Sequence, residues 1–434
     1  MNDPPHRLLA RRGVNLVTLA SHLAEHGPPP RLGGPHLLTG LVEAAGLTGR
    51  GGAFFPTGRK LRAVAAAPGP RVVVGNGAEG EPASAKDQLL LATAPHLVLD
   101  GLRLVAEAVD ARQAYLYLPR TPALIGVVRA AVAERTAAWG EPVPVELATA
   151  PHRFIAGEES ALASRLSGGP ARPRFTPPRV SERGVRARPT LVQNVETLAH
   201  IALVARYGPA WFRTLGTPNE PGTMLCTVGG AVARPAVVEV PVGTPLREVL
   251  AAAGGIVGRV SAILLGGYHG TWLDADQAVD LPLCQAALRP HGAALGCRVI
   301  VALPADVCGL VETARVARYL AEQSAGQCGP CHNGLPALAA AFVELAGPGP
   351  HRTGRARIDQ LTTLVEGRGA CHHPDGTVRF LRSALRVFSG EIARHEHGRC
   401  VGLEARIGPH APVGQVGAGL LPVPACPSGP DSWR

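Results

Sequence analysis

The sequence is poor in aromatic residues, lysine and long apolar runs, and these shortages exclude whole classes of protein. Phe, Trp and Tyr make up 4% of the chain, and no basic stripe with interleaved aromatics accompanies the net charge of +10, so we expect no nucleic-acid partner. No run approaches the roughly 18 apolar residues of a membrane span. The N-terminal apolar stretch is too short and too polar for a signal peptide. We therefore predict a cytoplasmic protein with no direct membrane span.

Lysine and cysteine are scarce in a way that suggests function. Among 43 basic residues only two are lysine, Lys60 and Lys86, and both lie in glycine-rich motifs. A compact ammonium group and a planar guanidinium are not interchangeable at binding sites, so this placement supports a binding role for both lysines. The nine cysteines are scattered along a long chain, which favours reduced thiols, some of them ligands, over a disulfide framework.

The pattern of apolar stretches predicts several domains and the α/β class. Helix-like and strand-like segments alternate as in parallel βαβ units, then give way to a β-grasp pattern and to a four-helix bundle. The predicted segments are an N-terminal helix and linker at 1–35, an α/β ligand-binding domain at 36–215, a β-grasp module at 220–290, a helical domain at 306–400 and a disordered tail at 401–434. In the β-grasp module, Thr244 is the predicted N-cap of the helix and Pro245 its first residue. The last three helices are expected at 335–346, 355–366 and 377–397.

The motif TGRGGAFFPTGRK, at 48–60, combines a flexible backbone with charge and aromatic faces. Its glycines allow a ligand to approach the backbone and expose N–H groups to an anion. The candidate ligand-binding residues are Gly49, Arg50, Gly51, Gly52, Phe54, Phe55, Gly58 and Lys60. A surface loop would explain the glycines equally well.

The motif VVVGNGAEGEPASAKD, at 72–87, begins with a buried strand that ends at Asn76, and the loop after it carries Glu79 and Glu81. Ligands bind at the carboxyl ends of parallel strands in α/β sheets. Carboxylates there suit ribose hydroxyls or a carboxamide. A solvated acidic loop is the alternative.

Two further motifs place polar residues where helices are expected to begin. In RFIAGEESALASRL, at 153–166, Glu158 and Glu159 follow Gly157, and in PTLVQNVETLAH, at 189–200, Asn194 leads into a helix. The helix dipole alone favours acidic residues at such positions, so each glutamate also has a structural explanation.

The segment QSAGQCGPCHNG, at 323–334, contains a C-x-x-C pair, Cys328 and Cys331, with Ala325 three residues before it. A pair with this spacing suits either an iron–sulfur cluster or a zinc ion.

Taken in order, the five motifs resemble the family of NADH-binding flavoprotein subunits (F subunits) of NADH-quinone oxidoreductase, respiratory complex I, over about residues 40–200 and 306–395. The family pattern reads G-R-G-G-A-G-F-P-T-G-x-K, N-A-D-E-x-E-P-G-x-x-K-D, C-G-E-E-T-A-L, N-N-V-E-T-L and S-C-G-x-C-x-P-C-x-x-G. The resemblance implies an oxidoreductase subunit that passes electrons from NADH through FMN to a [4Fe–4S] cluster. The acceptor would be a quinone-linked complex or a ferredoxin-like or other electron-transfer subunit, which would hold the chain peripherally at the inner membrane face.

The resemblance assigns roles to residues by their place in the motifs. It implies FMN contacts by Gly49, Arg50, Gly51, Gly52, Lys60, Asn76, Glu79, Gly157, Glu158 and Asn194. It implies NADH contacts by Phe55, Glu81 and Glu159, and catalytic roles for Glu79 and Glu159.

Four residues depart from the family pattern around the flavin and the nucleotide. Phe54 replaces a glycine, Ala78 an aspartate, Gln193 an asparagine and Ala63 an aromatic residue that sandwiches adenine. Loss of such stacking removes roughly 1 kcal/mol, so we expect weakened NADH binding. This suggests a stand-alone or auxiliary paralogue.

The cysteines depart as well. By the resemblance, Cys328, Cys331 and Cys371 are the second, third and fourth cluster ligands, and Ala325 stands at the first. Three thiolates would hold a four-iron cluster completed by water, His332 or Cys308, or a three-iron cluster. A Cys₃His zinc site that uses His372 or His373 is the rival, and reduced thiols without metal are the third alternative. The alternative function is a non-catalytic scaffold or ligand-binding paralogue that has lost the cluster and NADH oxidation.

Overall fold

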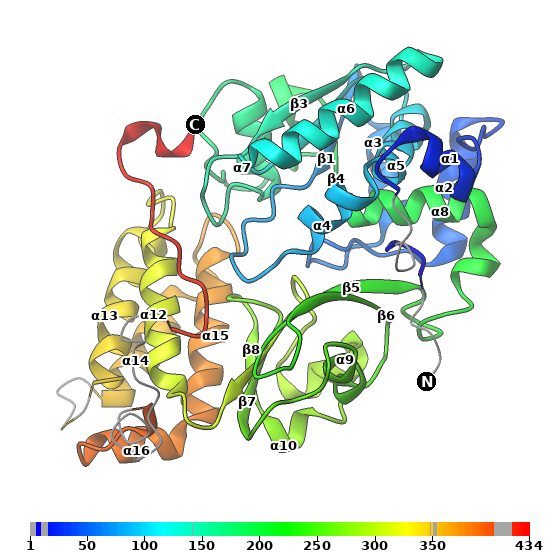
Figure 1. Ribbon diagram of the computed structural model, residues 1–434. Coiled ribbons are helices and arrows are strands. Elements are labelled where there is room, and N and C mark those ends of the chain that lie inside the picture. The colour runs from blue at the N-terminus through cyan, green and yellow to red at the C-terminus, as the bar shows by residue number, and fades with distance from the viewer. Residues whose placement is uncertain (1–5, 10–15, 141, 348, 350–353, 403–418) are drawn as a thin grey trace.

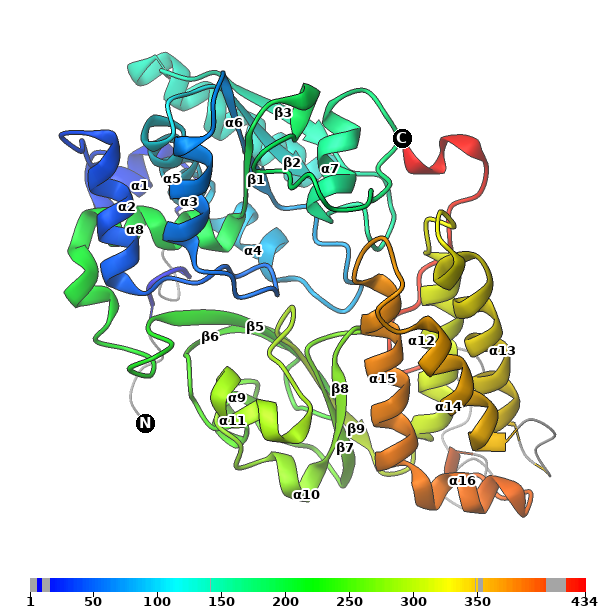
Figure 2. The ribbon, with the colours of Figure 1, turned by 180° about the vertical axis from the view of Figure 1, so that it is seen from behind.

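The structure is a computed structural model that describes residues 6–9, 16–140, 142–347, 349, 354–402 and 419–434. Three units lie side by side: an α/β domain, a smaller sheet domain packed below it in the view of Figure 1, and a helical domain at their flank (Figures 1 and 2). The predicted α/β class is confirmed.

The α/β domain is built on a four-stranded sheet with the order β3-β2-β1-β4, in which all neighbours are parallel. Its strands are β1 (Arg71–Asn76), β2 (Ala111–Leu118), β3 (Val145–Thr149) and β4 (Thr190–Asn194). The four central residues of β1, VVVG, are buried, as expected of a parallel strand covered on both faces.

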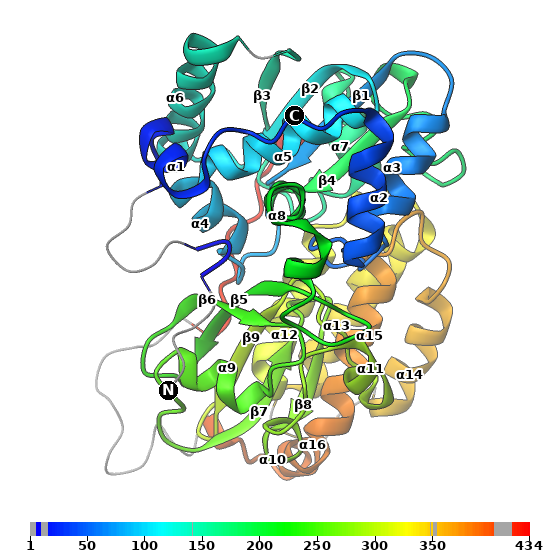
Figure 3. The same cartoon turned by 90° about the vertical axis from the view of Figure 1, so that its right-hand side faces the viewer.

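Helices cover this sheet and fill its core. They are α2 (Pro35–Ala45), α3 (Thr57–Ala66), α4 (Lys86–Thr93), α5 (Pro95–Ala108), α6 (Pro122–Trp139), α7 (Glu159–Leu166) and α8 (Val195–Phe212). Figure 3 shows α8 end-on near the middle of the molecule. Helices α5 and α8 approach so closely that a Cβ added at Gly101 would lie 2.0 Å from the carbonyl oxygen of Leu198. Glycine is therefore required at this crossing.

The predicted N-terminal helix is present as α1 (Leu19–His26), and it ends at Gly27. Thr18 is its N-cap and accepts a hydrogen bond from the Ser21 N–H. His22 is buried, and its Nε2 lies 2.9 Å from Asp100 Oδ2 in α5. The parts of the predicted segment at 1–5 and 10–15 lie outside the described residues.

The second domain is a five-stranded sheet of β-grasp type with the order β6-β5-β9-β7-β8. It contains β5 (Thr223–Gly230), β6 (Ala236–Pro241), α9 (Leu246–Ala252), β7 (Val260–Leu265), β8 (Thr271–Asp274), α10 (Ala275–Ala278), α11 (Gln285–Leu288) and β9 (Val299–Pro304). The predicted start of α9 is wrong by one residue. Pro245 is the N-cap with ψ 142°, and the Thr244 hydroxyl donates to the Pro241 carbonyl at 2.8 Å, so it does not cap the helix.

The helical domain contains α12 (Gly309–Glu322), α13 (Leu335–Leu345), α14 (Gly354–Val365), α15 (His373–Val387) and α16 (Ser389–Glu396). The helix predicted at 377–397 is two helices, because the chain leaves helical geometry at Phe388, where φ is −100° and ψ is 26°. A π-helical turn, Pro330–Gly334, leads into α13 and includes Cys331. Such turns are rare and occur frequently at functional sites.

The segment 419–434 packs along the boundary between the helical and α/β domains (Figure 1). Arg153 donates to the Pro427 carbonyl and to the Ser432 hydroxyl, both at 2.6 Å. The guanidinium of Arg153 also lies 4.7 Å from the ring centre of Trp433, and Leu421 is fully buried. The prediction of a disordered tail does not hold for this segment, because a buried arginine and an aromatic ring fix it; residues 403–418 lie outside the described residues.

Among the described helices, none is by itself long and apolar enough to cross a membrane; α4 and α5 pass that test only as a pair bent by 97°.

Candidate functional site

A cavity of about 590 Å³ lies where the carboxyl ends of β1 and β4 face the β-grasp sheet and the start of α15. This volume is within the range of cofactor and substrate sites, and the position is the one where α/β sheets bind ligands. The predicted residues that line it are Gly51, Gly52, Asn76, Glu79, Glu81, Lys86, Gly157, Glu158, Asn194, Cys371, His372 and His373. Gly52 has φ +108°, a backbone conformation that residues other than glycine rarely adopt.

Two asparagines form the floor of the cavity at neighbouring strand ends. Asn76 and Asn194 are paired in the register of β1 and β4. The Asn76 amide donates to the Gly157 carbonyl at 2.8 Å, which ties the loop before α7 to the sheet. Asn194 caps α8 by accepting from the Glu196 N–H at 3.0 Å, and its amide donates to Asp87 at 2.7 Å. Both side chains therefore hold loops in place around the cavity.

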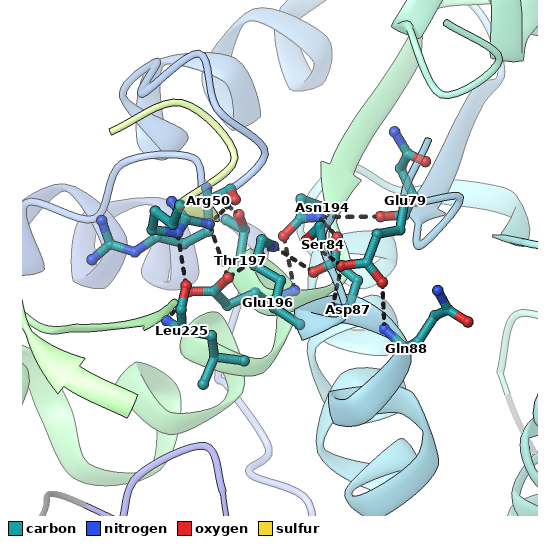
Figure 4. Close-up of polar contacts among 12 residues, drawn as sticks. Arg50, Glu79, Ser84, Asp87, Gln88, Asn194, Glu196, Thr197 and Leu225 are labelled. Atoms are coloured by element: carbon teal, nitrogen blue, oxygen red, sulfur yellow. Dashed lines mark hydrogen bonds and ion pairs between the residues drawn. The ribbon is translucent and has the colours of Figure 1, made fainter. Parts of the chain in front are cut away.

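The carboxylate of Glu79 organises the loop that follows β1. It accepts hydrogen bonds from the Ser84 hydroxyl at 2.6 Å and from the N–H groups of Asp87 and Gln88, both at 3.0 Å (Figure 4). These bonds cap the N-terminus of α4 and keep Glu79 at a φ of +43°, which is uncommon for a residue with a side chain. The predicted loop carboxylate is thus a structural group as well as a cavity wall.

A buried ionic network joins the α/β domain to the β-grasp sheet beneath this loop (Figure 4). Lys86 lies 2.5 Å from Asp87 Oδ1 and 2.9 Å from Glu196 Oε2, and Arg298 lies 2.9 Å from the same Glu196 oxygen. Burial alone would raise the pKa of Glu196, but Arg298 and Lys86 lower it to about 2. Glu196 also accepts from the Leu225 N–H of β5 at 3.0 Å.

Sequence patterns reveal only half of this network. Lys86 stands out as one of two lysines and Glu196 lies in the motif at 189–200, but nothing in the sequence marks Arg298 as a functional residue. Arg298 lies 102 positions from Glu196, and an arginine at the start of β9 has no local pattern that distinguishes it from the many other arginines.

Glu81 is a cavity carboxyl whose protonation is strongly perturbed. Burial raises its pKa from 4.5 to about 7, although the N–H groups of Tyr268 and Ala83 donate to it. The thiol of Cys297 lies beside it in the same cavity. A carboxyl with this pKa can hold or release a proton near neutral pH.

Two departures from the family pattern leave the cavity open. Phe54 is not among the residues that line it; its ring packs against the core of the β-grasp domain, 5.8 Å from the Arg298 guanidinium. Ala78 is buried, and its methyl group is 3.3 Å from where a Cβ on Gly157 would lie. Phe54 therefore does not block the site.

Four predicted residues lie outside the cavity lining at the neighbouring surface. Lys60 and Glu159 pair with each other at 2.7 Å, and their side chains are 24% and 42% exposed. Phe55 is 43% exposed, and the Arg59 guanidinium lies 5.6 Å from its ring centre. Gly49 closes the glycine loop through its N–H, which donates to the Phe55 carbonyl at 2.9 Å.

Arg50, also outside the lining, anchors the glycine loop from behind. Its N–H donates to the Thr197 hydroxyl at 2.8 Å, and its guanidinium donates to the Pro221 carbonyl at 3.1 Å. Burial, with help from Arg298, lowers the pKa of Arg50 to about 10, which leaves it charged at neutral pH.

The three predicted cluster cysteines come together at the edge of the cavity. Cys328, Cys331 and Cys371 are close enough to one another for their charges to interact, and burial, together with this interaction, raises the pKa values of Cys331 and Cys371. Among the described residues, the three thiols do not form a group with all sulfurs within 4.8 Å. A single ion would need such closeness, whereas a cluster binds each thiolate to a separate iron. The spacing thus favours a cluster over one zinc ion.

The histidines considered as further cluster ligands are either hydrogen-bonded to other groups or exposed to solvent. His373 uses both ring nitrogens, one 3.0 Å from His269 and one 2.8 Å from the Leu320 carbonyl. His332 is exposed, and the side chain of His372 is fully exposed. Cys308 lies at the opposite end of α12 from Cys328, about 20 Å away along a 14-residue helix. None of these four residues completes the thiol group in this structure.

The chain matches three family models: the Nuo51 FMN-binding domain over residues 42–203, an SLBB domain over 225–263, and the NADH-ubiquinone oxidoreductase-F iron-sulfur binding region over 312–395. It is 32% identical to the second NADH-quinone oxidoreductase F subunit of Rhizobium meliloti, covering 84% of this chain and 90% of that protein. It is 33% identical to the corresponding F subunit of Escherichia coli, covering 82% and 84%.

A solved structure of similar fold is a chain of an NAD+-reducing [NiFe]-hydrogenase in the H2-reduced state, with a TM-score of 0.77 and 32% identity over 87% of this chain. This chain spans 63% of that hydrogenase chain.

Proposed function

Because the chain belongs to the family of NADH-quinone oxidoreductase F subunits, we propose that it is an NADH dehydrogenase-like oxidoreductase subunit that passes electrons from NADH through FMN to an iron–sulfur cluster. The family resemblance seen in the five motifs is confirmed by the matches along the chain. No observation on the described residues favours the non-catalytic alternative.

One observation carries the proposal: a single cavity reaches from the glycine loop and the ends of β1 and β4 to Cys371. A redox cofactor in this cavity would lie beside a thiol that belongs to the predicted cluster site. Short distances between redox centres are what an electron-transfer protein must provide, and a cavity made only for a small metabolite would not need this thiol.

The residues present fit FMN. The floor offers amide and backbone groups from Asn76 and Asn194, and Gly51 and Gly52 of the glycine loop line the cavity without side chains that would fill it. FMN supplies the chemistry of accepting a hydride and releasing electrons one at a time. The chain's own contribution is to keep the loops rigid through Glu79, Asn194 and the Lys86 network.

For NADH, the proposed contacts lie on the exposed side of the glycine loop. Phe55 presents an aromatic face and Glu159 a carboxylate at a solvent-accessible position, and Lys60, which the resemblance assigns to FMN, pairs with Glu159. Glu81, whose pKa is near 7, would hold or release a proton inside the cavity, next to Cys297. The catalytic roles of Glu79 and Glu159 stay predictions from the family pattern.

The cluster site would be held by Cys328, Cys331 and Cys371. Since Ala325 cannot bind iron, we propose either a three-iron cluster or a four-iron cluster with one iron bound by a ligand from solvent. The electron acceptor would be a ferredoxin-like or other electron-transfer protein, and any contact with the inner membrane face would come through such partners.

The test is to purify the full chain under anaerobic conditions and count flavin, iron and sulfide on one sample. We expect flavin with several irons and matching sulfide, and NADH-driven reduction of an artificial acceptor. Colourless protein that stays so after incubation with FMN, iron and sulfide would refute the proposal. Ala325→Cys should hold four irons, which is an increase if the unaltered chain holds a three-iron cluster, and Ala321→Cys, one turn earlier on α12, is a control that should keep the iron count of the unaltered chain.

A further inference from the structure

A second group of metal-binding side chains lies at the end of the helical domain remote from the cavity. Cys308 is the N-cap of α12, Glu391 and His395 lie four residues apart on α16, and Cys400 follows that helix. One ligand atom from each residue lies within 4.8 Å of all the others. Cys308, His395 and Cys400 are buried, and the Glu391 side chain is 12% exposed.

Two distances measured from His395 in this group match those around a tetrahedral zinc ion. With Zn–S of about 2.3 Å and Zn–N and Zn–O of about 2.0–2.1 Å, neighbouring ligands in a tetrahedron are about 3.5 Å apart for S and N and about 3.4 Å apart for N and O. The Cys308 Sγ to His395 Nε2 distance is 3.5 Å, and the His395 Nε2 to Glu391 Oε1 distance is 3.3 Å.

The ligand types agree with the geometry. Thiolate, imidazole and carboxylate are the usual zinc donors, and two thiolates with an imidazole favour zinc over magnesium or calcium. Glu391 Oε1 is oriented by the Val401 N–H, which donates to it at 3.1 Å. Cys308 and Cys400 are both free thiols in the structure, and their sulfurs lie within 4.8 Å of each other.

We propose that Cys308, Glu391, His395 and Cys400 form a closed site for one zinc-type divalent ion, separate from the predicted iron–sulfur site. The bound ion would take two thiolates, the Nε2 of a neutral imidazole and one carboxylate oxygen, and the two thiol protons would be released to solvent.

Such an ion would be structural. Four protein ligands with no open position are typical of structural sites, whereas catalytic zinc keeps a position for water. It would fasten α16 and Cys400, four residues after the end of that helix, to Cys308 at the start of α12, 83 positions before Glu391. The end of the helical domain would thereby be fixed to its beginning.

The test is metal analysis of the full chain, purified without a metal-affinity tag, with zinc, iron and flavin measured together. We expect one zinc per chain. The variants Cys308→Ser and His395→Gln should lower zinc at least tenfold and leave iron and flavin unchanged, whereas Cys328→Ser should lower iron and leave zinc. Cys284→Ser, a buried thiol of the β-grasp domain, is the matched control and should change neither metal.

The flavin content and the circular dichroism spectrum report whether each variant is folded. Should the cysteine variants fail to fold, X-ray absorption at the zinc edge of the unaltered chain decides the question, because this site requires two sulfur and two nitrogen or oxygen neighbours. Reduced protein that contains no zinc and takes up neither added Zn²⁺ nor added Co²⁺ would overturn the proposal. So would zinc that persists in the Cys308→Ser and His395→Gln double variant, or a Cys308–Cys400 disulfide found by mass spectrometry.

Discussion

The candidate site has a buried half and an exposed half, and both are built on ion pairs of nearly the same length. In the buried half, Lys86 and Arg298 each lie 2.9 Å from Glu196, and all three side chains are at most 3% exposed. In the exposed half, Lys60 lies 2.7 Å from Glu159, but their side chains are 24% and 42% exposed. A solvent-exposed ion pair contributes roughly 0–1 kcal/mol to the free energy of unfolding. Removal of one partner from a buried pair, in contrast, leaves an uncompensated charge in the protein interior. Distance alone therefore does not tell a structural pair from one that is available to a substrate.

Glu196→Gln should have the largest effect on stability. It leaves Lys86 and Arg298 facing each other with only Asp87 to balance them, at a cost of about 3–5 kcal/mol. We expect a lower thermal unfolding midpoint and loss of bound flavin, measured by calorimetry and absorbance. Glu107→Gln is the matched control, because its exposed pair with Arg103 has nearly the same length, 2.8 Å. An equal loss of stability in both variants would show that burial does not distinguish the two kinds of ion pair.

Glu81→Gln should remove a pH dependence from the flavin-free protein. With a folded pKa near 7 and an ordinary value of 4.5, the folded state holds this proton more tightly than the unfolded state. The resulting stability is complete below pH 4.5 and is lost as pH rises to about 7, for a total of about 3 kcal/mol. Unfolding midpoints at pH 5 and pH 7.5 should differ less in the variant than in the unaltered protein. Equal differences would show that Glu81 titrates normally.

Ala63→Tyr should restore an aromatic face on the exposed half. Ala63 is exposed on α3, one turn after Lys60, and a stacked adenine contributes roughly 1 kcal/mol. We expect the KM for NADH to fall severalfold with kcat unchanged. Ala137→Tyr, at an exposed position on α6, should leave both constants unchanged. No change in KM at position 63 would show that adenine binds elsewhere.

Glu159→Gln should have the smallest effect on stability. The pair with Lys60 is exposed, so unfolding should change by no more than ~1 kcal/mol. If the exposed half binds NADH, the KM for NADH should nevertheless rise while the flavin content stays constant. A large loss of stability would place this pair with the buried network instead.

The parts of the molecule that could be predicted from the sequence are those determined by residues close together in the chain. The strand ends at Asn76 and Asn194, the glycine loop and the C-x-x-C pair stand in short patterns that specify turns, caps and ligand spacing. The partners of Arg298 and Cys308 could not be found in this way, because each residue meets them only after distant elements pack together. The sequence also left the orientation of Phe54 open, and it is the packing of the β-grasp core that decides it.

The hydrogen bonds that hold the Arg153 side chain have a consequence for biosynthesis. Arg153 and its neighbour Phe154, which lines the cavity, belong to the α/β domain, yet the carbonyl and hydroxyl that hold Arg153 are encoded 274 and 279 residues later. A nascent α/β domain emerging from the ribosome can form its sheet early, but it must wait for almost the whole remaining chain before this wall of the cavity is fixed. Flavin loading is therefore expected to follow translation, and a ribosome stalled between residues 215 and 420 should display a folded domain that retains cofactor poorly.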